Sequence, residues 1–283
     1  MHWVLRWLST RPLWFLHALG GALGWLAYAG SPSYRRRLRD NARQAGVSDA
    51  DRRASVAEAG RLVMELPRLW LRAPQRAIED PVRWEGAELI ESLLGHERGL
   101  ILLTPHMGSF EMAAQGYAER FGAVQPITVL YRPARKAWLR DIEATARARP
   151  HLATAPASLS GVRQMLRALR RGETVGLLPD QVPPEGMGEW ASFFGRPAYT
   201  MTLAARLVQQ TGAAAIVLIA ERLPRGAGFV IRVMPLPQPL PDKADDAAAA
   251  LAINQSMEAV IAVKPSQYLW GYHRYKAPRR VAL

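Results

Sequence analysis

The sequence contains no cysteine, and this absence removes several kinds of chemistry at once. A chain without thiols forms no disulfide, no cysteine-ligated zinc or iron–sulfur site and no thiol nucleophile. The six histidines also lack the spacing of metal ligands. No G-x-S-x-G nucleophile elbow, no G-x-x-x-x-G-K-[ST] loop and no strand-associated GxGxxG unit occurs. We therefore expect neither a serine hydrolase of that type nor a nucleotide-binding protein, and a site without a metal or other cofactor.

Lysine is scarce, at positions 136, 243, 264 and 276, yet the chain is strongly basic because arginine is abundant. Its 37 Lys and Arg against 24 Asp and Glu give a formal charge of +13. Such an excess favours an anionic partner, which could be nucleic acid, an acidic protein, anionic lipid or a phosphorylated substrate. A GC-rich coding bias would raise arginine and alanine together in the same way. With 283 residues, 49% of them apolar, the chain is long enough for one large or two small folded domains.

Residues 12–29 form an apolar stretch without a formally charged side chain. Arginines flank it on both sides, with the larger cluster at 35–39, and tryptophans gather near its ends. A helix packed through its glycines onto the rest of the protein is the alternative to a membrane segment. We predict membrane attachment of an N-terminal unit, residues 1–31, either spanning the bilayer or lying in its interface. Because the larger basic cluster follows the apolar run, residues 32–283 are expected on the cytoplasmic side.

Beyond the N-terminal unit, apolar strand-like runs alternate with helix-like stretches, which predicts an α/β fold. We expect a single mixed sheet with helices on both faces. Pro67 should kink or end the second of the helices, and residues 182–198 read as a loop rich in proline and glycine. The expected strands are 82–84, 99–104, 124–130, 174–178, 214–221 and 228–234, and the expected helices are 33–45, 48–72, 86–94, 109–121, 134–148, 160–171, 200–211 and 244–263.

His106 is the strongest candidate for a catalytic residue. It follows the apolar run 99–103 and precedes an expected helix, and active sites of open α/β sheets commonly lie at such strand ends. Glu111, five positions later, is about one turn into that helix, so its carboxylate could orient the imidazole and stabilise its charged form. A base with an orienting acid can deprotonate a hydroxyl group. A structural histidine beside an ordinary turn, with Ser109 as a helix cap, is the competing interpretation.

Two further strand ends carry polar residues that could meet His106 in one cleft. Arg132 follows one expected strand, and Asp180 and Gln181 follow another. Phe193 and Phe194 could line an acyl pocket or fill the core. The aromatic and basic segment 267–276 could contact headgroups or phosphate, and such a mixture can also bind single-stranded nucleic acid. No recognisable nucleic-acid-binding module surrounds it, so we expect no nucleic-acid partner.

Together these motifs resemble the bacterial lipid A biosynthesis acyltransferases that add late lauroyl or myristoyl chains, within the His-x4-Asp/Glu glycerolipid acyltransferase group. The resemblance spans nearly the whole chain. It includes the N-terminal apolar helix, the arginine-rich stretch with Asn41, and the ordered motifs that end at Lys276. Ser109 and Phe110 stand where the family commonly has Asn and Trp. The motifs are His106 to Glu111, Tyr131-Arg132-Pro133, Pro179-Asp180-Gln181, Phe193-Phe194-Gly195 and Gln267 to Trp270 with Arg274-Tyr275-Lys276.

The resemblance implies a glycerolipid-acyltransferase-like fold at the bacterial inner membrane. It also implies transfer of a fatty acyl chain from acyl carrier protein to a hydroxyl of a membrane glycolipid, without a cofactor. His106 would act as the base and Glu111 as its orienting acid, with backbone N–H groups near Gly108 and Ser109 stabilising the oxyanion. Arg132, Asp180, Gln181 and an arginine that is either Arg147 or Arg149 would position the acceptor. Phe110, Phe193 and Phe194 are candidates for the acyl pocket.

Two other functions stay open at this point. The nearer is an acyltransferase that uses a lysophospholipid or another glycolipid as acceptor. The more distant is a non-enzymatic basic protein that binds membrane or nucleic acid, whose affinity would fall steeply with salt.

Overall fold

The computed structural model describes residues 2–95, 98–131, 149–241 and 243–279, and it confirms an α/β fold built on one mixed sheet. Seven strands lie in the order β1-β9-β8-β2-β5-β3-β4. Neighbouring strands run parallel except β8 and β9, which are antiparallel. The strands are β1 Val82–Glu85, β2 Leu100–Leu103, β3 Ile127–Tyr131, β4 Leu152–Pro156, β5 Thr174–Leu177, β8 Ala214–Arg222 and β9 Phe229–Pro235.

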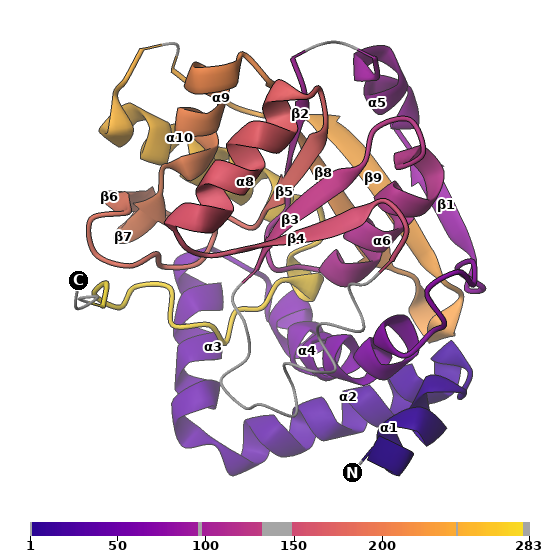
Figure 1. Ribbon diagram of the computed structural model, residues 1–283. Coiled ribbons are helices and arrows are strands. Elements are labelled where there is room, and N and C mark those ends of the chain that lie inside the picture. Colours follow the sequence, from indigo (N-terminus) through magenta and orange to yellow (C-terminus); the bar gives the residue numbers. More distant parts are fainter. Residues whose placement is uncertain (1, 96–97, 132–148, 242, 280–283) are drawn as a thin grey trace.

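Helices cover both faces of the sheet, as the sequence predicts (Figure 1). The fully buried strand β2 shows why, because its side chains alternate between two cores. Ile101 and Leu103 pack in one core with α3, α8, α9 and α10, and Leu100 and Leu102 pack in the other with α5 and α6. These helices are α3 Pro32–Gln44, α5 Ala87–Leu93, α6 Phe110–Phe121, α8 Leu159–Arg170, α9 Leu203–Thr211 and α10 Asp246–Val263.

The N-terminal helices, α1 His2–Ser9 and α2 Leu13–Gly30, lie against the long helix α4 Asp49–Trp70 at one end of the molecule (Figure 1). The crossing of α2 and α4 is so close that a Cβ on Gly60 would meet the Gly20 carbonyl oxygen at 1.9 Å. Glycine is therefore required there, and α2 buries its glycine face on the protein. Across the described ranges, no helix has both the length and the apolar character to cross a bilayer.

Two local features differ from the sequence prediction. The segment read as a loop at 182–198 contains most of an antiparallel hairpin, β6 Gly188–Phe193 and β7 Arg196–Met201. Strand β4 was not predicted at all. Helix α4 ends at Trp70, two residues before the end that the sequence predicts, so Pro67 does not end it. The helix expected at 134–148 falls outside the described residues.

Candidate active site

His106 and Asp180 come from neighbouring strands and meet at one edge of the sheet. His106 follows β2 by three residues, and Asp180 follows β5 by three residues. Because β2 and β5 are parallel and in register from Leu100–Thr174 to Leu103–Leu177, their carboxyl ends open onto the same edge. This is the position where open α/β sheets place their ligands. The predicted convergence of the two strand ends is confirmed.

The Asp180 carboxylate holds the His106 residue through two hydrogen bonds. The backbone N–H of His106 donates to Oδ2 at 2.9 Å, and the ring Nδ1 lies 2.7 Å from Oδ1. With Nδ1–H donating to the carboxylate, the other ring nitrogen is an acceptor. Gln181 meets this acceptor, because its Nε2 lies 2.9 Å from His106 Nε2. The imidazole therefore has the tautomer that a general base requires.

Asp180 is buried, with 2% of its side chain exposed, and it stays ionised because of its neighbours. Burial alone would raise its pKa, but the charge and hydrogen bonds of His106, with Arg274 nearby, lower the pKa below its ordinary value. Burial also raises the pKa of Tyr268 well above its usual range, and the Asp180 charge acts in the same direction. A neutral phenol thus stands beside an ionised carboxylate. Asp180 is well placed to stabilise a charged imidazolium.

The C-terminal segment clamps the loop that carries His106. Leu269 N–H donates to the His106 carbonyl oxygen at 3.1 Å, and Gly108 N–H donates to the Gln267 carbonyl oxygen at 3.0 Å. Gly108 adopts a φ of +53°, and a Cβ there would lie 2.0 Å from the Ala220 carbonyl oxygen. Glycine is therefore needed for the conformation and for the close approach.

These contacts correct the expected oxyanion site. Gly108 N–H is bound to Gln267, and Ser109 N–H donates to the Ala220 carbonyl oxygen at 2.8 Å. Both amides are thus bound within the fold. The Gln181 amide is a donor that lies at the imidazole, and helix α6 begins at Phe110, whose ring lies against the His106 ring.

A buried group of charges, which the sequence did not predict, holds the loop of His106 at the Gly108 carbonyl oxygen. The Arg222 guanidinium donates to Glu65 Oε2 at 2.8 Å, to Glu58 Oε2 at 2.7 Å and to the Gly108 carbonyl oxygen at 2.5 Å. Glu65 also lies 3.2 Å from His17 Nε2 of α2. Burial opposes ionisation of Glu65, yet the Arg222 charge lowers the Glu65 pKa overall. The available signal was the seven-residue spacing of Glu58 and Glu65, which places two acids on one face of α4.

An apolar cavity of about 340 Å³ opens beside His106. Phe110, Glu111 and Gln181 line it close to the imidazole. The rest of its wall is mainly aliphatic, with Tyr131 and Ser158 as polar exceptions. The further lining residues are Ala114, Val129, Leu130, Tyr131, Ala157, Ser158, Val162, Leu178, Val182, Pro183, Pro184, Met187, Met201 and Leu203. An apolar cavity of this kind suits a hydrocarbon chain better than a polar metabolite.

Other predicted site residues lie away from this cavity. Phe193 and Phe194 pack on each other, with ring centroids 4.7 Å apart, and Phe194 also contacts Trp270. They fill the core beneath the C-terminal segment and do not line the cavity, so their predicted place in an acyl pocket is corrected. The aromatic residue at the imidazole is Phe110, 5.2 Å from the His106 ring.

Of the predicted arginines, Arg149 is buried and bound to carbonyl oxygens at the end of α4. Its Nη2 donates to Leu69 at 2.6 Å and to Arg72 at 3.1 Å. Burial lowers the Arg149 pKa to about 10, so the group stays charged at neutral pH. These bonds commit its guanidinium to the fold rather than to a substrate. Arg132 and Arg147 lie outside the described residues.

Comparison with known proteins shows the family to which the chain belongs. A family model described as bacterial lipid A biosynthesis acyltransferase matches residues 2–277. The chain is 26% identical to the lipid A biosynthesis lauroyltransferase of Escherichia coli (strain K12), over 96% of this chain and 91% of that protein. It is 25% identical to the lipid A biosynthesis myristoyltransferase of the same strain, over 79% of this chain and 68% of the other. With the match over nearly its whole length, the chain belongs to the bacterial lipid A biosynthesis acyltransferase family and is an acyltransferase.

Proposed function

We propose that this enzyme transfers a fatty acyl chain from an acyl carrier protein thioester to a hydroxyl group of a lipid A precursor, with His106 as general base. The observation that carries the proposal is the imidazole itself. Its Nδ1 is bound to a buried carboxylate, and its ring lines an apolar cavity through which an acyl chain could approach. The relatives' names supply the acyl group and the pathway, and family membership sets aside a non-enzymatic role.

The reaction proceeds by direct attack. The acceptor hydroxyl displaces the Gln181 amide from His106 Nε2 and gives its proton to that nitrogen as the oxygen attacks the thioester carbonyl carbon. Asp180 accepts the Nδ1–H bond and stabilises the imidazolium that forms. The tetrahedral intermediate then collapses, the carbon–sulfur bond breaks, and the leaving thiolate takes the proton from Nε2. The ester and a free thiol result, and the imidazole returns to its starting state.

The oxyanion needs hydrogen-bond donors that become available when the substrates bind. The displaced Gln181 amide is one such donor, and the N–H group of Phe110 at the start of α6 would be a second. A helix N-terminus also favours developing negative charge. Gln181 would thus occupy the base in the resting enzyme and bind the oxyanion during the reaction.

Glu111 acts from the cavity side of His106 in this scheme. Asp180 already binds Nδ1. The Glu111 carboxylate in the cavity wall would instead bind the acceptor hydroxyl and stabilise the positive charge that develops on the ring. Arg132 would position a phosphorylated acceptor, together with Arg147, the other member of the pair between which the resemblance leaves the choice open.

The enzyme works at the bacterial inner membrane, from the cytoplasmic face, with its N-terminal helices lying in the interface. Large apolar side chains on α1 and α2 are exposed, although α2 packs its glycine face on α4. Exposed tryptophans with neighbouring arginines are typical of surfaces that lie among lipid headgroups. The side chains on this surface are Trp3, Trp7, Trp14, Leu23, Trp25 and Leu26.

The test is acyl transfer by the purified enzyme with an acyl carrier protein thioester and a lipid A precursor, followed by mass spectrometry of the product. His106→Ala should lower turnover by about 10²- to 10⁴-fold, the usual contribution of a general base. His273→Ala, at an exposed histidine outside the cavity, is the matched control and should stay near wild type. A folded His106→Ala enzyme with nearly full activity would refute the role, and transfer only to lysophospholipid would refute the acceptor.

A further inference from the structure

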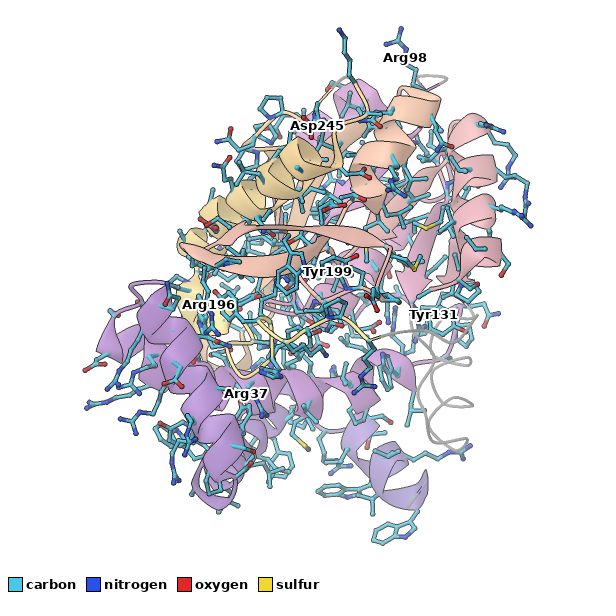
Figure 2. All side chains as sticks on the ribbon, turned by 90° about the vertical axis from the view of Figure 1, so that its left-hand side faces the viewer. Arg37, Arg98, Tyr131, Arg196, Tyr199 and Asp245 are labelled. Carbon is cyan, nitrogen blue, oxygen red and sulfur yellow. The ribbon has the colours of Figure 1, made fainter. Side chains whose placement is uncertain are left out.

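The outer face of α8 carries a row of arginines. Arg163, Arg167 and Arg170 are all exposed, and their spacing of four and three residues places them along one side of the helix. Figure 2 shows nitrogen-tipped side chains extending from this helix into solvent on the right of the molecule. The apolar residues Met165, Ala168 and Leu169 of the same helix are buried in the core. The helix thus presents a purely cationic stripe outward.

This stripe has no acidic partner in the part of the chain that the structure describes. Other surface arginines do, since Arg206 pairs with Asp246 and Arg171 pairs with Glu173 at the end of α8 itself. Like charges at these spacings repel one another and destabilise an isolated helix. An acidic partner would relieve that repulsion, and its contacts would replace water at the exposed guanidinium groups.

The stripe begins at the mouth of the acyl cavity. Ser158, which caps α8, and Val162, in its first turn, both line the cavity. Leu159 between them is 71% exposed, so an apolar side chain stands at the start of the cationic row. Tyr131 of the cavity wall is tied to this point, because Ala157 N–H donates to its carbonyl oxygen at 2.9 Å.

We propose that the face of α8 formed by Leu159, Arg163, Arg167 and Arg170 is the docking surface for an acidic protein that carries the acyl thioester. This rests on the proposed function, in which a carrier protein is the donor. An acidic helix against the arginines would set the carrier's thioester arm at the Ser158 end, where the chain can enter the cavity. Charge complementarity of this kind chiefly raises the rate of encounter and fixes the register.

The observations favour a protein over a lipid surface as the occupant. Four exposed tryptophans lie on α1 and α2, at the bottom of both views, whereas α8 lies in the upper half of the molecule (Figures 1 and 2). Apart from Leu159, the described surface of α8 offers no large exposed apolar side chain for a bilayer. The basic helix α3, which follows α2 directly, is the better candidate for anionic headgroups.

The experiment compares two donors in steady-state kinetics with the full-length enzyme. One donor is a fatty acyl carrier protein, and the other is the same acyl chain on N-acetylcysteamine, a small neutral thioester. The test variant carries Arg163→Glu, Arg167→Glu and Arg170→Glu. A control with the same change in net charge carries Arg83→Glu, Arg98→Glu and Lys243→Glu, all at exposed positions on other parts of the surface.

We expect the α8 variant to raise KM for the acyl carrier protein at least tenfold, with kcat and the kinetics of the small thioester unchanged. The control should match the wild type with both donors. Added salt should lower wild-type kcat/KM for the carrier and affect the variant little, because screening acts on the contacts that were removed. The triple Arg→Gln variant should give an intermediate KM, and it decides the question if the triple Glu variant does not fold.

An unchanged KM for the carrier in either folded triple variant would overturn the proposal. Loss of binding to phosphatidylglycerol vesicles with an unchanged KM would also overturn it and would assign the stripe to lipid. Failure of the proposed function would give a different result. The wild-type enzyme would then show no His106-dependent transfer from either thioester.

Discussion

Replacing Asp180 by asparagine changes the chemistry of the site while keeping the shape of the side chain. In the wild-type protein the Asp180 carboxylate accepts two hydrogen bonds, from the His106 backbone N–H at 2.9 Å and from the His106 Nδ1 at 2.7 Å. An asparagine has one acceptor oxygen and one donor NH₂ group. If its oxygen keeps the backbone bond, its NH₂ faces Nδ1 and forces the proton onto Nε2. The base would then lack its lone pair on the cavity side.

The size of the effect follows from two losses. The wrong tautomer removes the proton acceptor, and the neutral amide no longer stabilises the imidazolium. In enzymes with a histidine base and a buried aspartate, the same substitution lowers kcat by about 10⁴-fold. We expect about 10³- to 10⁴-fold here, which corresponds to about 4 to 5.5 kcal/mol in the activation barrier. The double variant with His106→Ala should be no slower than His106→Ala alone, because the two residues act as one unit.

The assay is acyl transfer under saturating substrates, with circular dichroism to confirm folding. Glu111→Gln is the informative comparison, because the sequence assigned the orienting role to Glu111 and the structure places Asp180 on Nδ1. We expect Asp180→Asn to be the slower of the two. A folded Asp180→Asn enzyme within tenfold of wild-type kcat would refute this reasoning, as would a larger loss in Glu111→Gln.

Two further predictions concern stability. Arg222→Met leaves Glu65 buried without its cation, so we expect the free energy of unfolding to fall by about 3–5 kcal/mol in urea titrations; adding Glu65→Gln should restore part of it, and no restoration would contradict the pairing. The pKa values of Asp180 and Glu65 are both lowered in the folded state. Ionisation of these groups therefore stabilises the fold at pH values above their pKa in the unfolded chain, which is about 4. This stabilisation is lost as the pH falls through their pKa values in the folded protein. The melting temperature should therefore fall at pH values below about 4, and it should fall less steeply in Glu65→Gln. Equal slopes in the two proteins would count against this role of Glu65.

The sequence located the edge of the sheet that carries His106 because that information is local. An apolar run, a histidine and a helix start lie within 99–112, and the structure confirms a strand and a helix on the two sides of His106. The partner of Nδ1 was harder to find, since it depends on which strand lies beside β2. Glu111 is five residues from His106 along the chain, whereas Asp180 is 74 residues away and reaches the ring only because β2 and β5 are neighbours.

Local pattern left open whether Pro67 kinks or ends α4. The helix runs past Pro67 to Trp70 because tertiary contacts support its last turn. The Arg149 guanidinium donates to carbonyl oxygens at that end, which the helix cannot satisfy by itself. Arg149, one of the arginines that the sequence offered as substrate ligands, therefore serves as a cap from 80 residues away. The proline and glycine content of 182–198 similarly concealed the β6–β7 hairpin, which turns at Phe194 and Gly195, both with positive φ.

The buried charges under His106 connect the active site to the N-terminal helices. Arg222 bonds to the Gly108 carbonyl oxygen on one side and to Glu65 on the other, and Glu65 contacts His17 of α2. Because α2 also packs through glycine onto α4, it cannot shift without disturbing the acids that hold Arg222. The surface proposed to meet the membrane and the loop that carries the base are therefore parts of one packed unit. A bilayer that orients the N-terminal helices would, through these contacts, also orient the imidazole and the cavity beside it.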